Sequence, residues 1–316
     1  MVLCQNNLLV VYWEDSLAAL SELSTELRAK NDPRKFILSQ LGRVHVTNIL
    51  APSRIQAAIS ICPKLSITKI KMECDGFLTD LMLGILVSFP MLDLKDIHIV
   101  GLENSLVTFE NGIVPVLEII GRNLHNLKIS NFQLVDPLVV VANCPNLKTL
   151  KFRLNKSYTE STEIHNFLPA IETPRHLEKF YCSVTAPYDS ITTNIPENQV
   201  SFFLGSPLLK HIRIFSCTTL TDSAIETAFR KSKFHKMSSV DIAYCSSITN
   251  YGLDFFKQDK NSIAFFSIEN CLLVDTHLLE TEWTAMIMQK NWKVKLNFVY
   301  EFQNLFADEN EMLIDE

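Results

Sequence analysis

Apolar and polar residues follow the same short pattern nine times along the chain. An apolar residue is followed three positions later by a second, and two positions after that by a third. The second and third therefore lie on one face of an extended segment, and the pattern predicts a short strand with one buried face. The nine patterns begin at Leu41, Ile67, Leu94, Leu124, Leu147, Leu177, Leu209, Met237 and Ile263.

Segments with helical spacing lie between these strands. Three of them have polar starts and apolar periodicity, at 136–144, 221–231 and 278–290. Asp136 before Pro137, and Thr221 before Asp222, are residue types that cap helix N-termini. Proline cannot continue a helix, and it precedes several strands, as Pro63, Pro90, Pro145 and Pro207. The predicted order is strand, turn, helix and next strand.

The starts of the pattern are about 28 residues apart on average, close to the range of leucine-rich repeats. Burying three apolar side chains contributes about 5–9 kcal/mol per repeat. Ordering a repeat costs about 1–2 kcal/mol per residue, so a repeat is stable only when its neighbours stack on both sides. The sequence therefore predicts an α/β fold, a leucine-rich-repeat solenoid. In this right-handed β-α horseshoe the parallel sheet lines the concave face and helices cover the convex face.

Three segments follow from this interpretation. They are an N-terminal cap or irregular first repeat at 1–40, a solenoid of nine or ten repeats at 41–300, and an acidic C-terminal tail at 301–316. Within the first segment we expect a strand and then an amphipathic helix, whose apolar side carries Leu17, Leu20, Leu23 and Leu27. Two longer inserts, 155–166 and 185–199, are rich in Ser, Thr and Asn and are predicted to be loops.

A cysteine recurs after three of the later strands, as Cys217, Cys245 and Cys271. Each stands where the chain turns off the strand, and a small side chain pointing into the array fits there. Their spacings of 28 and 26 residues, without a C-x-x-C motif, do not match a zinc site. We interpret these cysteines as structural. Reduced thiols favour a reducing compartment, so we expect a cytoplasmic or nuclear location.

The segments "CTTLTDSAI" (217–225), "CSSITNYGL" (245–253) and "CPNLKTLKF" (144–152) resemble the cysteine-containing repeats of the F-box/leucine-rich-repeat family. In that family the solenoid recognises substrates, and an N-terminal F-box docks it onto an SCF-type ubiquitin ligase. The resemblance implies a role in ubiquitin-dependent protein degradation. Residues 1–40 lack the Leu-Pro opening of an F-box, so the ligase adaptor and cullin are expected partners only if an F-box is supplied elsewhere.

The residues between the inward positions of each strand face the concave surface of such a solenoid. Many of them are basic or aromatic, and we predict that they bind a protein partner through an acidic or phosphorylated segment. The candidate residues are Lys71, His98, Lys128, Lys151, Arg153, Tyr181, Arg213 and Phe215. The alternative is a solvated sheet face on which lysine is merely tolerated.

Charge and motifs exclude other classes of function. A net charge of −6 argues against nucleic acid and membrane surfaces as partners, and the longest early apolar run, 8–13, is too short to span a bilayer. The chain has no P-loop, H-E-x-x-H, G-x-S-x-G or dinucleotide motif. We therefore expect no catalytic residue, metal or cofactor. Besides a ligase substrate receptor, a stand-alone interaction scaffold and an enzyme regulator remain open.

Overall fold

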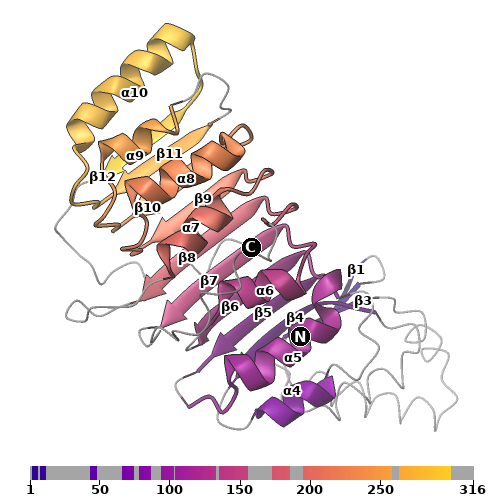
Figure 1. The fold of residues 1–316 in the computed structure, drawn as a ribbon. Coiled ribbons are helices and arrows are strands. Elements are labelled where there is room, and N and C mark those ends of the chain that lie inside the picture. The colour runs from indigo at the N-terminus through magenta and orange to yellow at the C-terminus, as the bar shows by residue number, and fades with distance from the viewer. Residues whose placement is uncertain are drawn as a thin grey trace, which may run out of the picture. The chain divides into compact units, whose positions relative to one another are not determined.

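A computed structural model of the chain describes residues 2–5, 8–11, 43–47, 66–74, 78–86, 94–102, 104–132, 135–155, 173–185, 195–257 and 263–299. The chain divides into two compact units, and strands alternate with helices in both of them (Figure 1). The first unit comprises Met1–Leu177 and Thr185–Thr193, and the second comprises Glu178–Val184 and Asn194–Glu316.

Seven strands are described in the first unit. They are β1 (Val2–Gln5), β2 (Leu8–Val11), β3 (Arg43–Thr47), β4 (Ser66–Cys74), β5 (Asp96–Gly101), β6 (Asn126–Phe132) and β7 (Thr149–Asn155). From β2 to β7 each strand pairs in parallel with the next, whereas β1 and β2 pair antiparallel. The helices between them are α4 (Asp80–Leu86), the π-helix η1 (Phe109–Ile113), α5 (Val114–Ile120), the 3-10 helix η2 (Gly121–Asn123) and α6 (Pro137–Asn143).

The second unit continues the alternation with shorter connections. Its elements are β8 (Lys179–Thr185), α7 (Glu197–Leu204), β9 (His211–Phe215), α8 (Asp222–Ser232), β10 (Ser239–Ala243), α9 (Asn250–Asp254), β11 (Phe265–Glu269), α10 (Thr276–Lys290) and β12 (Lys295–Val299). All four consecutive strand pairs are parallel. The predicted fold class, an α/β repeat with a parallel sheet, is therefore confirmed within each unit, and helices are described between successive strands from β4 to β7 and from β8 to β12.

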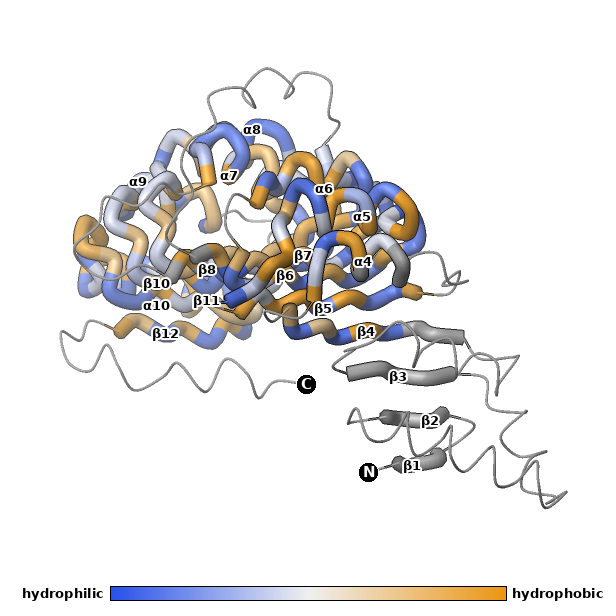
Figure 2. Tube along the Cα trace, turned by 90° about the horizontal axis from the view of Figure 1, so that it is seen from below, coloured by the Kyte–Doolittle hydropathy of each residue, from blue (hydrophilic) through white to orange (hydrophobic). Residues whose placement is uncertain are grey.

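The core of each unit lies between its strands and its helices, and Figure 2 shows the alternation of apolar and polar residues along the strands. From β4 to β11 every strand buries the two inward residues that the repeating pattern predicts, each at 3% exposure or less. These pairs are Ile70 and Met72, Ile97 and Ile99, Leu127 and Ile129, Leu150 and Phe152, Phe180 and Cys182, Ile212 and Ile214, Val240 and Ile242, and Phe266 and Ile268.

Three strands of the second unit end in the same left-handed turn. Ser216, Tyr244 and Asn270 follow β9, β10 and β11 with φ of 53°, 54° and 48°. A positive φ costs a residue other than glycine about 1–2 kcal/mol. Each of their N–H groups donates to the carbonyl that ends the next strand. These bonds offset that cost; the acceptors are Ala243, Glu269 and Val299, at 2.9, 2.9 and 3.0 Å.

The repeat cysteines follow these turns and are completely buried. Cys217, Cys245 and Cys271 each have 0% exposure. The Cys245 thiol donates to the Ile214 carbonyl at 3.9 Å, and burial raises the pKa of the Cys217 thiol. Among the described residues no group of three His, Cys, Asp or Glu side chains is placed to hold a metal ion. The thiols thus lie in the packing between successive repeats.

Two details differ from the sequence-based expectations. The strand β1, which forms a hairpin with β2, was not predicted. The insert at 185–199 is not entirely a loop, because α7 begins at Glu197. Pro196 at its N-cap has a φ of −54°, and the acidic Glu197 in the first turn suits the helix dipole. The helix expected around Leu17–Leu27 and the tail at 301–316 lie outside the described residues.

No helix that the structure describes is both long enough and apolar enough to cross a membrane.

Candidate functional site: the polar face of the sheet

Four of the predicted site residues lie side by side in the first unit. The strand register pairs Lys71 of β4 with His98 of β5, His98 with Lys128 of β6, and Lys128 with Lys151 of β7. Each lies between two buried residues of its strand, so its side chain projects from the sheet face opposite the core. Neighbouring strands are about 4.8 Å apart, so the row spans about 14 Å. We call these four residues the basic row.

The basic row belongs to a sheet face that is positive overall. Three register rows across β4–β7 hold five cations, which are Lys69, Lys71, Lys128, Lys151 and Arg153. The same rows hold two carboxylates, Glu73 and Asp96, so these positions have a net charge of +3. The chain as a whole has a net charge of −6. The positive charge of this face is therefore a local feature.

Lys71 and Arg153, on the first and last of these four strands, have different surroundings. Lys71 Nζ lies 3.3 Å from Glu73 Oε1, and both side chains are 37% exposed. An exposed pair of this kind contributes about 0–1 kcal/mol, so a partner carboxylate can compete for the lysine. Arg153 lies opposite Ser130, and its buried Nε has no hydrogen-bond acceptor among the residues that the structure describes. Because this Nε is buried, a bound oxyanion could accept from it only after the Arg153 side chain moves.

The predicted site residues of the second unit form a different arrangement. Tyr181 of β8 lies opposite Arg213 of β9, which lies opposite Asp241 of β10. Arg213 Nε is 2.9 Å from Asp241 Oδ2, so the arginine is already paired within the chain. Burial raises the pKa of Tyr181 above its usual value, against a smaller opposite effect of Arg213, and the phenol stays neutral at physiological pH.

Phe215, predicted as an aromatic anchor, packs against a residue that the sequence analysis missed. The rings of Phe215 and Tyr244 have centroids 4.7 Å apart, and the Tyr244 hydroxyl lies 3.1 Å from Glu269 Oε1. Tyr244 occupies the left-handed turn after β10. A comparison of the residues that directly precede each repeat cysteine could have found it, because serine and asparagine hold the same place in the neighbouring repeats.

The predicted site residues therefore form two different arrangements, one in each unit. In the first unit the structure brings together Lys71, His98, Lys128 and Lys151, with Arg153 one register row away. In the second unit it brings together Tyr181, Arg213 and Phe215, where the arginine is neutralised by Asp241. The sheet face of the first unit is the better candidate for binding an acidic segment.

His211, at the start of β9, makes the stability of the chain depend on pH. Burial, and then the nearby Lys179 and Lys210, hold the pKa of His211 below its ordinary value of 6.5. The unfolded chain therefore takes up this proton at a higher pH than the folded chain does. We expect the free energy of unfolding to decrease as pH falls below about 6.5. Guanidinium unfolding at about pH 7.5 and about pH 5.5 measures this decrease in the free energy of unfolding. The decrease should be smaller in His211→Asn than in the unchanged chain, and equal decreases in the two proteins would contradict the assignment to His211.

No family model and no curated protein matches the chain. Among solved structures, the chain is similar to one described as "Crystal structure of Rad7 and Elc1 complex in yeast". The similarity covers 92% of this chain and 86% of that chain, at 13% sequence identity and a TM-score of 0.39.

Proposed function

We propose that the chain is a protein-binding repeat module that captures an acidic or phosphorylated segment of a partner on the sheet face of its first unit. The observation that supports this most directly is the basic row. Lys71, His98, Lys128 and Lys151 are adjacent across four parallel strands, on a face with a net charge of +3. Amino groups and a guanidinium form charge-assisted hydrogen bonds with carboxylates and phosphates, which are about twice as strong as neutral ones.

The size of the row fits a short extended segment. A chain in extended conformation advances about 3.3 Å per residue, so about four residues would cross the 14 Å between the ends of the row. Side chains on one face of such a segment recur at every second residue. A partner with acidic residues at alternate positions could therefore contact several cations of the row together, and Arg153 could bind one oxyanion through two nitrogens.

We further propose that the captured partner is the substrate of an SCF-type ubiquitin ligase. The support for this part is the resemblance of the repeats at 217–225 and 245–253 to those of F-box/leucine-rich-repeat proteins. The adaptor and cullin of the ligase would bind this chain only if an F-box is supplied elsewhere, because residues 1–40 lack the Leu-Pro opening of an F-box.

Affinity purification followed by mass spectrometry tests the ligase role, applied both to this chain and to any longer form of the gene product. We expect the ligase adaptor and cullin to be recovered together with a partner that contains an acidic segment. Recovery of the partner without adaptor or cullin from either form would instead identify a stand-alone scaffold. A regulator of an enzyme would be recognised by a change in the turnover rate of the recovered partner.

A further inference from the structure

The turn between β11 and α10 exposes two adjacent leucines. Cys271 and Val274 are buried, with 0% and 5% exposure, and the Val274 N–H donates to the Cys271 carbonyl at 3.0 Å. This bond closes a β-turn. Its two central residues, Leu272 and Leu273, are 60% and 59% exposed.

The preceding repeats have polar residues at the same place. Thr218 and Thr219 follow Cys217, and Ser246 and Ser247 follow Cys245, in each case at turn positions. Thr218 is exposed even though three further strands follow it, whereas Thr219, Ser246 and Ser247 are half-buried. The turn is therefore at least partly open to solvent in each of these repeats. Small polar residues are favoured in such turns, so the fold itself does not require leucine here.

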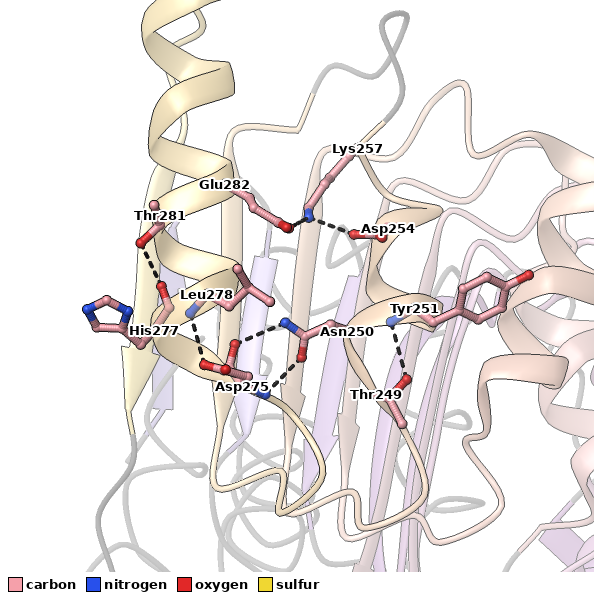
Figure 3. Close-up of polar contacts among 10 residues, drawn as sticks. All are labelled: Thr249, Asn250, Tyr251, Asp254, Lys257, Asp275, His277, Leu278, Thr281 and Glu282. Atoms are coloured by element: carbon pink, nitrogen blue, oxygen red, sulfur yellow. Dashed lines mark hydrogen bonds and ion pairs between the residues drawn. The ribbon is translucent and has the colours of Figure 1, made fainter.

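The leucine-bearing turn is held in place at both ends. At the strand end, the Asn270 N–H donates to the Val299 carbonyl at 3.0 Å. At the helix end, the Asn250 side chain accepts from the Asp275 N–H at 2.8 Å and donates to the Asp275 carbonyl at 3.0 Å (Figure 3). The Asp275 carboxylate also caps α10 by accepting from the Leu278 N–H at 2.9 Å. A turn fixed in this way loses little conformational entropy when a partner binds.

A third exposed leucine follows the same turn. Leu278 in the first turn of α10 is 47% exposed, and its N–H donates to the Asp275 carboxylate that ends the turn. Figure 3 shows Leu278 beside the Asn250–Asp275 hydrogen bonds, whereas the ring of Tyr251 points away from them. We call Leu272, Leu273 and Leu278 the leucine surface.

The charge around the leucine surface is negative. Residues 269–282 contain no lysine or arginine and four carboxylates, which are Glu269, Asp275, Glu280 and Glu282. Lys257, three residues after the end of α9, pairs with Asp254 of α9 and with Glu282 of α10, and its side chain is only 11% exposed. Its charge is therefore balanced by these two carboxylates and adds little positive charge to the exposed surface.

We propose that the leucine surface is a docking site for a protein segment with apolar side chains flanked by lysine or arginine. Apolar side chains of the partner would cover Leu272 and Leu273, and its cations would lie against the carboxylates around them. This preference is opposite to that of the basic row, which favours acidic segments. The chain would thus have a second protein-binding surface, in its second unit, with a different partner chemistry.

A pair of synthetic amphipathic peptides of about 15 residues tests the proposal on the full chain. Both peptides carry leucine on one helical face. On the opposite face one peptide carries lysine, and the other carries glutamate at the same positions. Fluorescence anisotropy should show that the lysine peptide binds at least about tenfold more tightly than the glutamate peptide. Leu272→Ser with Leu273→Ser, which reproduces the Ser246–Ser247 pair of the preceding repeat, should raise the Kd of the lysine peptide at least about tenfold.

Two further variants separate the leucine surface from general effects. Met288→Ser removes an apolar side chain of α10 that is 78% exposed and lies outside the surface; it should leave the Kd unchanged. Glu280→Lys should weaken binding of the lysine peptide and keeps both leucines, so it tests the proposal even if the double serine variant unfolds. Equal binding of both peptides, or a Kd insensitive to the serine pair and to Glu280→Lys, would overturn the proposal.

Other occupants of the surface would be recognised in the same experiment. A dimer that depends on Leu272 and Leu273, detected by light scattering, would assign the surface to a second copy of the chain. Binding of the lysine peptide only after removal of residues 301–316 would assign it to the chain's own tail. Either result would overturn the proposal.

Discussion

Replacing Gly252 by Ala should lower the free energy of unfolding by about 2–3 kcal/mol. A Cβ at this position would lie 2.3 Å from Oδ1 of Asp222 and 3.0 Å from its Cα. The Asp222 carboxylate is held in place because it accepts three hydrogen bonds: from the Gly252 N–H at 3.1 Å, the Thr249 N–H at 2.9 Å and the Thr249 hydroxyl at 2.6 Å. The new methyl group would force this carboxylate away from all three donors.

A double-mutant cycle identifies the cause of this loss. Asp222→Ala alone should cost about 2–3 kcal/mol, because it leaves the donors of Thr249 and Gly252 without an acceptor. The double variant should lose at least about 1 kcal/mol less than the sum, since Ala at 222 has no oxygen for the new Cβ to meet. Guanidinium unfolding of the four proteins measures the coupling. Additive losses would show that the close approach is unimportant.

Gly84→Ala is the matched control for the first substitution. Gly84 also lies in a helix, α4, but a Cβ there would meet no atom within 4 Å. Alanine is the better helix former, so this variant should be neutral or more stable by up to about 1 kcal/mol. Destabilisation by Gly84→Ala comparable to that by Gly252→Ala would indicate a general effect of replacing helical glycine.

The first unit contains the same link between repeats. Asp80, the first residue of α4, accepts hydrogen bonds from the N–H and hydroxyl of Thr108 at 2.9 and 3.0 Å. Thr108 caps η1, and a Cβ on Gly112 would lie 2.2 Å from Asp80 Oδ1. Asp80 at the start of α4 thus binds the cap residue of η1, and Gly112 of η1 leaves room for the Asp80 carboxylate.

The sequence predicted those features that depend on neighbouring residues. The alternation in each strand identified the inward residues, such as Val240 and Ile242, because a half-buried strand must repeat every two positions. The caps Asp136 and Thr221 were also identified, and each accepts a hydrogen bond from its own helix, from Leu138 and Ala224. Burial and capping are local requirements, and a single sequence records them.

Features that depend on contacts between repeats were not predicted. The acceptor of the Thr249 donors is 27 residues earlier in the chain, and nothing in the segment around Thr249 indicates it. The pairing of Arg213 with Asp241 likewise depends on the register of β9 with β10. The sequence therefore locates the cations of the candidate site but does not show that Asp241 of the next strand neutralises Arg213.

Reversing the charges of Lys128, Lys151 and Arg153 to glutamate should weaken capture of an acidic segment by more than about 100-fold. The three changes would convert the net charge of the face from +3 to −3, since each reversal removes two positive units. A hydrogen bond to a charged group contributes about 1.5–3 kcal/mol, and each 1.4 kcal/mol corresponds to a factor of ten in Kd. Anisotropy of a fluorescent peptide with alternating glutamates measures the loss.

The control must change the total charge equally without touching the sheet face. Arg122, Lys231 and Lys236 are exposed and lie outside the strands, so their reversal to glutamate meets this need. The peptide is held by the basic row and its neighbours if only the sheet-face variant binds it more weakly. In that case added salt should also weaken peptide binding less in this variant than in the unchanged chain. Equal losses would reflect the net charge of the whole chain. Unchanged binding in both variants would leave lysine on this face with no role beyond solvation, because a partner that depends on these cations must respond to their reversal.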